Sequence, residues 1–229
     1  LVGSEMCIRD RYKQIKGVLS KLTKTFEVKD LLCNILKDEK IKAEVLNRIE
    51  KIEPFIGEEA PKGSLKEQLM EEDAENLSRI LIEGVEMVKD NLTKYLSKDW
   101  FAMRPMHNLL FTRDASMSIN NEVLIGRMAN AIRDRESVIM RSIFDFPPEF
   151  KTSTLSLPAT PGATSRIQTI EGGDVLVARE DILVIGNGAR TSTQAIDLLM
   201  YEFIRRKSEK TQHIICLLYT SPSPRDVEE

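Results

Sequence analysis

The chain has 229 residues, with 33 lysines and arginines against 36 aspartates and glutamates, which gives a net charge of −3. This near-neutral balance gives no reason to expect nucleic acid or an anionic membrane surface as a partner. No apolar run is long enough to span a bilayer, so a membrane partner is not expected either.

The two ends of the chain do not read as natural protein. The chain opens with Leu1–Arg11 (LVGSEMCIRDR) and closes with Cys216–Glu229 (CLLYTSPSPRDVEE). Back-translation shows that Glu5–Arg11 and Cys216–Ser221 are compatible with opposite strands of one DNA segment, which resembles a transposon-derived sequencing adapter. We therefore expect residues 1–11 and 216–229 to be adapter-derived and exclude them from fold reasoning, in preference to a natural disordered tail. The remainder is expected to come from a longer gene.

The remaining residues hold 30 basic and 31 acidic side chains, because the first segment carries two of each sign and the last carries one basic and three acidic. Only one of the three cysteines, Cys33, lies outside the two ends. A single cysteine excludes a disulfide framework, and no cysteine and histidine spacing suggests a metal site.

Residues 12–100 are predicted to form a helical domain. Apolar residues recur at helical spacing from Leu31 to Ile52, and Pro54 and the stretch 61–63 interrupt the pattern. Ser64–Glu67 reads as a capping box that opens the next helix. One continuous buried stripe is predicted after it: Leu77, Ile80, Leu81, Val85, Val88 and Leu92.

Residues 101–215 are predicted to form a mixed α/β domain, because the apolar period shortens after Trp100. Four short runs are typical of strands: residues 122–126, 175–178, 182–185 and 212–215. Thr191 or Ser192 is expected to cap a helix whose buried side carries Ala195, Leu198, Leu199 and Phe203.

Acidic and basic residues in this second half suggest a binding site. Asp114 and Glu171 lie close to apolar runs, and paired carboxylates can hold the planar donors of a guanidinium. Arg133 and Arg190 could hold a carboxylate for the same reason, so a ligand with a guanidinium at one end and a carboxylate at the other would suit all four. The alternative is a set of ordinary ion pairs, with Arg135–Glu136 as one surface example.

Four motifs in this order resemble the arginine deiminases of the guanidine-modifying superfamily: FTRD at 111–114, RDRE at 133–136, IEGGD at 170–174 and GART at 188–191. The resemblance covers Trp100 to about Phe203. It implies an α/β fold, namely part of the five-bladed α/β-propeller known as the pentein fold. The first half resembles the inserted helical bundle of that family only in pattern and position.

The resemblance implies roles for individual residues. Asp114 matches the aspartate that holds the substrate guanidinium, and Glu171 matches an acid near the guanidinium and the catalytic histidine. Asp174 matches the aspartate that ends that motif. Ala115 departs from the family, where a proline is common at this position.

The remaining implied contacts involve the substrate's other end and the wall of its pocket. Asn108, Arg133 and Arg190 match positions that bind the amino-acid end of arginine. Phe111 matches an aromatic residue that lines the pocket.

The implied activity is hydrolysis of L-arginine to L-citrulline and ammonia without metal or cofactor, in a cytoplasmic enzyme that could form a homo-oligomer. The family uses a cysteine nucleophile and a histidine acid/base, and both lie later in the family's sequence than this chain reaches. Two alternatives stay open: an amidinotransferase of the same fold, and a non-catalytic arginine-binding protein.

Overall fold

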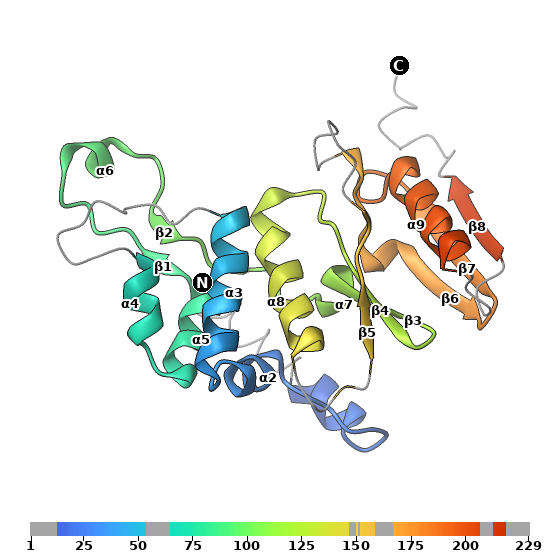
Figure 1. Cartoon of the computed structure of the whole chain (residues 1–229), viewed down its shortest axis with the longest axis horizontal. Coiled ribbons are helices and arrows are strands. Elements are labelled where there is room, and N and C mark those ends of the chain that lie inside the picture. The colour runs from blue at the N-terminus through green and yellow to red at the C-terminus, as the bar shows by residue number, and fades with distance from the viewer. Residues whose placement is uncertain are drawn as a thin grey trace.

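The computed structural model describes residues 13–53, 65–146, 150, 152–158, 167–206 and 213–218. Figure 1 shows these residues as an elongated array, with helices α2 to α5 at one end and a sheet covered by α9 at the other. Helix α8 lies between the two ends. The predicted mixed α/β class is confirmed by this arrangement of helices and sheets.

The helical end contains four amphipathic helices: α2 (Val28–Ile35), α3 (Glu39–Ile52), α4 (Leu65–Glu71) and α5 (Ala74–Glu83). Asp38 and Asp73 begin α3 and α5, and each carboxylate accepts two backbone N–H groups of the first turn. Such caps satisfy donors that have no partner within the helix. The predicted capping box begins at Ser64, which lies outside the described residues.

The predicted stripe from Leu77 to Leu92 is wrong beyond α5. The helix ends at Gly84, which has a φ of 83° and whose Cβ, if present, would lie 2.6 Å from the carbonyl oxygen of Met103. The chain then enters a short arm formed by β1 (Val85–Glu86), α6 (Leu92–Leu96) and β2 (Phe101–Met103). Val88 and Leu92 are therefore exposed rather than buried.

The first α/β unit is a hairpin followed by a helix and a third strand. Short helix α7 (Thr112–Ala115) leads into β3 (Ser116–Ile119), which pairs with β4 (Glu122–Ile125) in antiparallel register. The chain continues through η1 (Ala131–Arg133) and α8 (Asp134–Asp145). It returns as β5 (Ser153–Leu155), parallel to β4.

The second unit repeats this topology. Short helix η3 (Gly172–Asp174) leads into β6 (Val175–Arg179), which pairs antiparallel with β7 (Ile182–Asn187). Helix α9 (Thr193–Arg205) then leads to β8 (His213–Leu218), which is parallel to β7. Ser192 caps α9 by accepting the backbone N–H of Ala195 at 3.2 Å, so one of the two predicted caps is correct.

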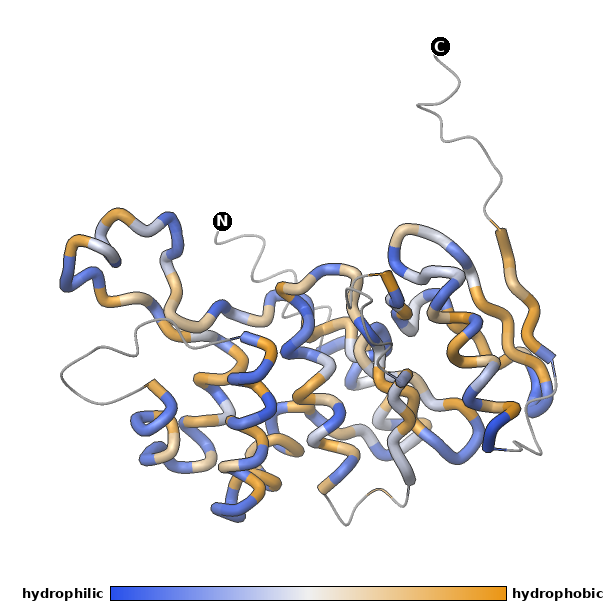
Figure 2. Tube along the Cα trace, turned by 45° about the horizontal axis from the view of Figure 1, so that its top comes forward, coloured by the Kyte–Doolittle hydropathy of each residue, from blue (hydrophilic) through white to orange (hydrophobic). Residues whose placement is uncertain are grey.

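Two apolar cores support these elements. One core joins α2, α3 and α5 to the buried side of α8, and it also includes Met103, Met106 and Ala115. The other lies between the two three-stranded sheets and α9, with Leu124, Leu155, Ile185, Leu199 and Phe203 among its members. Figure 2 shows the apolar residues of the helical end on the sides that face one another. Helix α8 belongs to the predicted second domain but shares a core with the helical end. The predicted domain boundary at residue 100 therefore stays a prediction.

The described residues form two separate three-stranded sheets, β3-β4-β5 and β6-β7-β8, beside the two-stranded β1-β2. Closure into a five-bladed propeller therefore stays a prediction. None of the described helices is both long and apolar enough to cross a membrane.

The expected adapter-derived ends are described only in part. Residues 1–11 lie outside the described residues, whereas Cys216–Leu218 form the last residues of β8. Leu217 and Leu218 are 52% and 62% exposed, and Tyr219 lies outside the described residues. The adapter origin stays a prediction.

Candidate functional site

Asp114 is positioned by a close approach between α7 and the end of β4. The N–H of Gly126 donates to the carbonyl oxygen of Ala115 at 2.9 Å. A Cβ on Gly126 would lie 2.4 Å from the carbonyl oxygen of Asp114, so only glycine allows this contact. The Asp114 side chain consequently lies in the interior, at the junction of the two units.

Glu171 is fixed from both sides and is only 3% exposed. Residues 127 and 170 exchange two backbone hydrogen bonds of 2.9 Å, which form an isolated bridge between the two units. The N–H of Ala129 donates to Glu171 Oε1 at 3.0 Å, and the N–H of Glu171 donates to Thr191 Oγ1 at 3.2 Å. The first unit therefore holds the carboxylate of Glu171, and the second unit holds its backbone.

Arg113 fastens α7 to the glycine motif of the second unit. Its Nε donates to the carbonyl oxygen of Gly172 at 3.1 Å. Its terminal nitrogen Nη2 donates to the carbonyl oxygen of Val175 at 2.6 Å. A Cβ on Gly172 would lie 1.9 Å from the carbonyl oxygen of Arg113. Glycine is required at this position because two backbone segments are in contact there. The motif alone could equally have indicated an ordinary turn.

Arg133 lies at the centre of three carboxylates, which we name the acid–arginine cluster: Asp114, Glu136 and Glu171 around Arg133. One terminal nitrogen of Arg133 lies 3.0 Å from Asp114 Oδ2 and 3.4 Å from Glu171 Oε2. Its Nε and other terminal nitrogen contact Glu136 at 2.9 to 3.2 Å. Burial lowers the pKa of Arg133, but the hydrogen bonds that its guanidinium donates to Glu136 and Asp114 outweigh this, so the pKa is raised.

The expected layout of the site is correct in one part and wrong in another. Asp114 and Glu171 were expected to face one cavity, and their carboxylates do lie close together, because both contact the same terminal nitrogen of Arg133. Arg133 was expected at the far end from these acids, yet its guanidinium lies between them. The physical reason is that buried carboxylates need a cation, and Arg133 is the guanidinium within reach.

Glu136 and Arg135 were considered as a surface ion pair, and this is also wrong because each is only 2% exposed. Glu136 belongs to the acid–arginine cluster. Arg135 instead donates to Glu53 at 2.9 Å and to the carbonyl oxygen of Arg104, which ties α8 to the helical end. The spacing of Arg133 and Glu136, three residues apart at a helix start, is the signal that could have revealed their contact.

The other predicted site residues lie around this cluster with fewer contacts. Arg190 is largely exposed, and its Nε lies 3.9 Å from Glu171 Oε2. Asn108 and Phe111 are exposed on the turn before α7. Asp174 is half-buried and has no side-chain hydrogen bond or ion pair with any described residue.

The charges of the site are not balanced. Three carboxylates of the cluster face two guanidinium groups, those of Arg133 and Arg190, so one negative charge is uncompensated. Arg135 and Glu53 pair with each other and leave this balance unchanged. Such a site favours a cationic ligand. Among the described residues, no group of three or more His, Cys, Asp or Glu side chains is placed to hold a metal ion.

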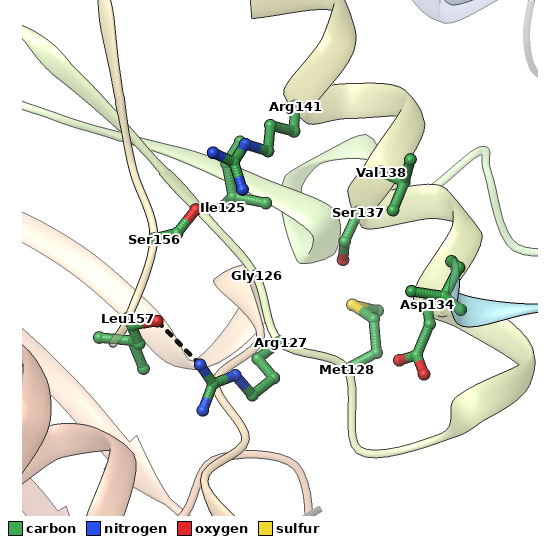
Figure 3. Close-up of a pocket in the computed structure, with 11 residues that line it drawn as sticks. Ile125, Gly126, Arg127, Met128, Asp134, Ser137, Val138, Arg141, Ser156 and Leu157 are labelled. Carbon is green, nitrogen blue, oxygen red and sulfur yellow. Dashed lines mark hydrogen bonds between the residues drawn. The ribbon is translucent and has the colours of Figure 1, made fainter. Parts of the chain in front are cut away.

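A separate cavity of about 280 Å³ lies between α8, the end of β4 and residues 156–157. Figure 3 shows its lining, and none of the predicted site residues takes part in it. The predicted site residues and this cavity are therefore separate.

Comparison with known proteins shows the family. A family model described as arginine deiminase matches residues 18–220. The chain belongs to the arginine deiminase family.

The relatives are bacterial arginine deiminases. The protein from Listeria monocytogenes serotype 4b is 29% identical over 205 residues, which cover 83% of this chain and 49% of the relative. The Bacillus cytotoxicus protein is 31% identical over 186 residues, covering 78% of this chain and 44% of the relative. The chain thus spans about half the length of the curated relatives that it matches.

Solved structures give a weaker likeness. A dimethylarginine dimethylaminohydrolase from Pseudomonas aeruginosa, complexed with citrulline, matches with a TM-score of 0.36 and 22% identity. The match covers 49% of this chain and 39% of that one.

Proposed function

We propose that this chain supplies the arginine-binding part of an arginine deiminase, which hydrolyses L-arginine to L-citrulline and ammonia. Family membership supports the activity, since the matched relatives are named arginine deiminases. One structural observation carries the proposal: the acid–arginine cluster already surrounds a guanidinium, that of Arg133, and retains one uncompensated negative charge.

In this proposal the substrate guanidinium binds to Asp114 and Glu171. Their carboxylates accept the planar donors of Arg133 in the structure, and the same lone pairs suit a free guanidinium. Binding of arginine then requires Arg133 to withdraw from both Asp114 and Glu171 while it keeps its contacts with Glu136. Arg133 would be free to meet the substrate carboxylate, together with Arg190 and Asn108. Phe111 would line the pocket and Asp174 would contribute a further polar contact.

The chemical step of the proposal needs a thiolate. The thiolate attacks the guanidinium carbon, and the histidine donates a proton to the departing amino group, which leaves as ammonia. Water then hydrolyses the covalent intermediate, which releases citrulline and the thiol. The described cysteines are Cys33 on α2 and Cys216 on β8. The cluster comes from α7, η1, α8 and the residue before η3 instead, so we propose that a different part of the whole protein supplies the nucleophile and the histidine. We expect no protein-dependent citrulline from the 229-residue chain alone.

Two other functions use the same cluster. In an amidinotransferase an amine would replace water as the acceptor of the covalent intermediate. A non-catalytic arginine-binding protein would keep the carboxylates without a thiol. Release of citrulline by the whole protein, with and without added amines, separates these functions.

Calorimetric titration of the chain with L-arginine and L-citrulline tests the binding step. We expect arginine to bind and the neutral citrulline to bind at least about tenfold more weakly, because a charged hydrogen bond is lost. Asp114→Asn should weaken arginine binding by about tenfold or more. The matched control Asp181→Asn removes a partly exposed carboxylate that pairs with Arg179 in a hairpin, so arginine binding should not change. Equal arginine affinity of the Asp114 variant and the unchanged chain would contradict the proposal.

The cytoplasmic location, the homo-oligomer and the absence of a cofactor stay predictions. Fractionation of the source cells and sedimentation of the purified protein would test the first two.

A further inference from the structure

The cavity beside α8 combines apolar walls with several polar side chains. Ile52, Ile125, Met128, Val138 and Leu157 supply the apolar lining. The polar lining comprises Arg127, Asp134, Ser137, Arg141 and Ser156. A cavity of about 280 Å³ is close to the smaller end of ordinary small-molecule sites. Its size suits a short ligand with one polar end.

Arg127 is a cation without a counter-ion. Its guanidinium donates to Gln168 Oε1 at 2.9 Å and to the carbonyl oxygens of Leu157 and Pro158 at 2.8 and 3.4 Å. All three acceptors are neutral, and Arg127 has no ion pair with any carboxylate in the described part of the chain. Burial lowers the pKa of Arg127, and no neighbouring acid offsets this effect. A half-buried guanidinium of this kind is stabilised by an anion.

The cavity lining also contains the hydroxyls of Ser137 and Ser156 and a second arginine, Arg141. Ser137 Oγ is buried and has no hydrogen-bond partner in the described structure, although buried hydroxyls normally have one. Arg141 contacts Asp145 only at 3.3 Å and is about half exposed. Figure 3 shows Ser137 extending from α8 toward the segment 126–128, and Arg141 reaching from α8 toward Ser156.

We propose that this cavity binds a small organic anion that has a carboxylate head and a short apolar body. The head meets Arg127, Arg141 and the Ser137 hydroxyl, and the body lies against the apolar walls. The two arginines outnumber Asp134, so the lining carries a net positive charge, opposite in sign to the acid–arginine cluster. A cationic substrate and this anion therefore bind at different places.

Hexanoate is the probe for a direct test by calorimetric titration of the complete 229-residue chain. We expect hexanoate to bind, and hexanol, which has the same apolar body without the charge, to bind at least about tenfold more weakly. Inorganic phosphate shows whether the head alone suffices, and it should bind more weakly than hexanoate because it lacks the apolar contacts.

The variants Arg127→Met and Arg141→Met should each weaken hexanoate binding by about tenfold. Arg141 is exposed enough that its loss leaves folding intact, so this variant remains informative if Arg127→Met fails to fold. The matched control Arg179→Met removes an exposed arginine that pairs with Asp181 on the β6–β7 hairpin, and it should bind hexanoate like the unchanged chain.

Absence of hexanoate binding, equal binding of hexanol, phosphate binding as tight as that of hexanoate, or equal affinity of the Arg141 variant would each overturn the proposal. The proposed function stands apart from this test because arginine binding is measured separately. Asp114→Asn should leave hexanoate binding unchanged, and a loss of hexanoate binding in this variant would show that the two sites are one.

Discussion

The two α/β units share one topology but use it differently. Each contains a hairpin, a helix and a third strand parallel to the second, and a short helix with an aspartate precedes each hairpin: α7 with Asp114 and η3 with Asp174. In the first unit the aspartate is buried in an ion-pair network, whereas Asp174 is half-buried without a described partner. The backbone therefore supplies the positions, and the side chains decide which positions become a site.

The helices of the two units show the same contrast. Helix α8 begins beside Arg133 and contains Glu136, both buried. Helix α9 carries its ion pairs at its last turn, where Glu202 contacts Arg205 at 2.8 Å and Arg206 at 3.2 Å and both arginines are exposed. Glu202 is itself only 5% exposed, so the two helices differ in the burial of the arginine partners. We expect pairs with a buried arginine and pairs with exposed arginines to differ in their contribution to stability, and this difference can be measured.

The largest expected effect is that of Glu136→Ala. The substitution leaves Arg133 buried with fewer partners, so the free energy of unfolding should fall by about 3–5 kcal/mol. Urea denaturation followed by circular dichroism measures it. Glu202→Ala in the second unit should cost only about 1 kcal/mol or less, because its arginine partners are solvated. Similar losses for both variants would show that the two helices do not differ in this way.

The glycines between the units should give an intermediate effect. In Gly172→Ala the new Cβ would meet the carbonyl oxygen of Arg113, and backbone shifts of this kind cost about 1–3 kcal/mol. Gly188→Ala meets nothing within 4 Å, and it should change stability by no more than about 1 kcal/mol. Thermal unfolding of both variants tests the contrast, and a stable Gly172 variant would mean that the two backbones separate at little cost.

The smallest expected effect concerns the ion pair between Asp145, at the end of α8, and Arg48 of α3. Among the described residues, α9 has no such ion pair with another helix. Burial raises the pKa of Asp145, but hydrogen bonds from Thr154 and Arg48 outweigh it and hold the pKa below its ordinary value of 3.8. The ionised form therefore stabilises the fold above that value, and this contribution is lost as the pH falls through the folded-state pKa.

Asp145→Asn should consequently lower stability by about 1 kcal/mol at neutral pH and by less in strong acid. Denaturant midpoints measured between pH 2 and pH 7 test this. Glu83→Gln, which removes an exposed partner of Arg79, is the control and should alter neither the midpoint nor its pH dependence. A constant difference at every pH would contradict the assignment to Asp145.

The strands that sequence reasoning found are those with unbroken apolar runs, namely β4, β6, β7 and β8. It missed β3 and β5, because Ser116 and Ser118 interrupt the apolar pattern of β3 and β5 has only three residues. It also overlooked the repeat of the two units, since the correspondence rests on the order and direction of strand pairing rather than on similar runs of sequence. The structure reveals the repeat because the order and direction of strand pairing can be compared without any similarity of residues.

The members of the candidate site were predicted better than their arrangement. Asp114, Glu171 and Arg133 come together as the motifs indicated, but the sequence could not reveal which arginine neutralises which acid. That choice depends on distances across the two units, such as the 3.0 Å contact of Arg133 with Asp114. Glu136 was missed because a charged residue next to another charged residue is typical of an exposed ion pair. Only the burial of the side chain distinguishes an exposed pair from a buried one.

Strand β8 has a consequence for how the chain behaves at high concentration. It is the last strand of its sheet among the described residues, and Ile215, Leu217 and Leu218 are exposed along it. An open edge with unpaired backbone groups and apolar side chains offers a template on which a second chain can add a strand. We therefore expect association between molecules to increase with concentration, and a lysine at Leu217 to reduce it, as light scattering would detect.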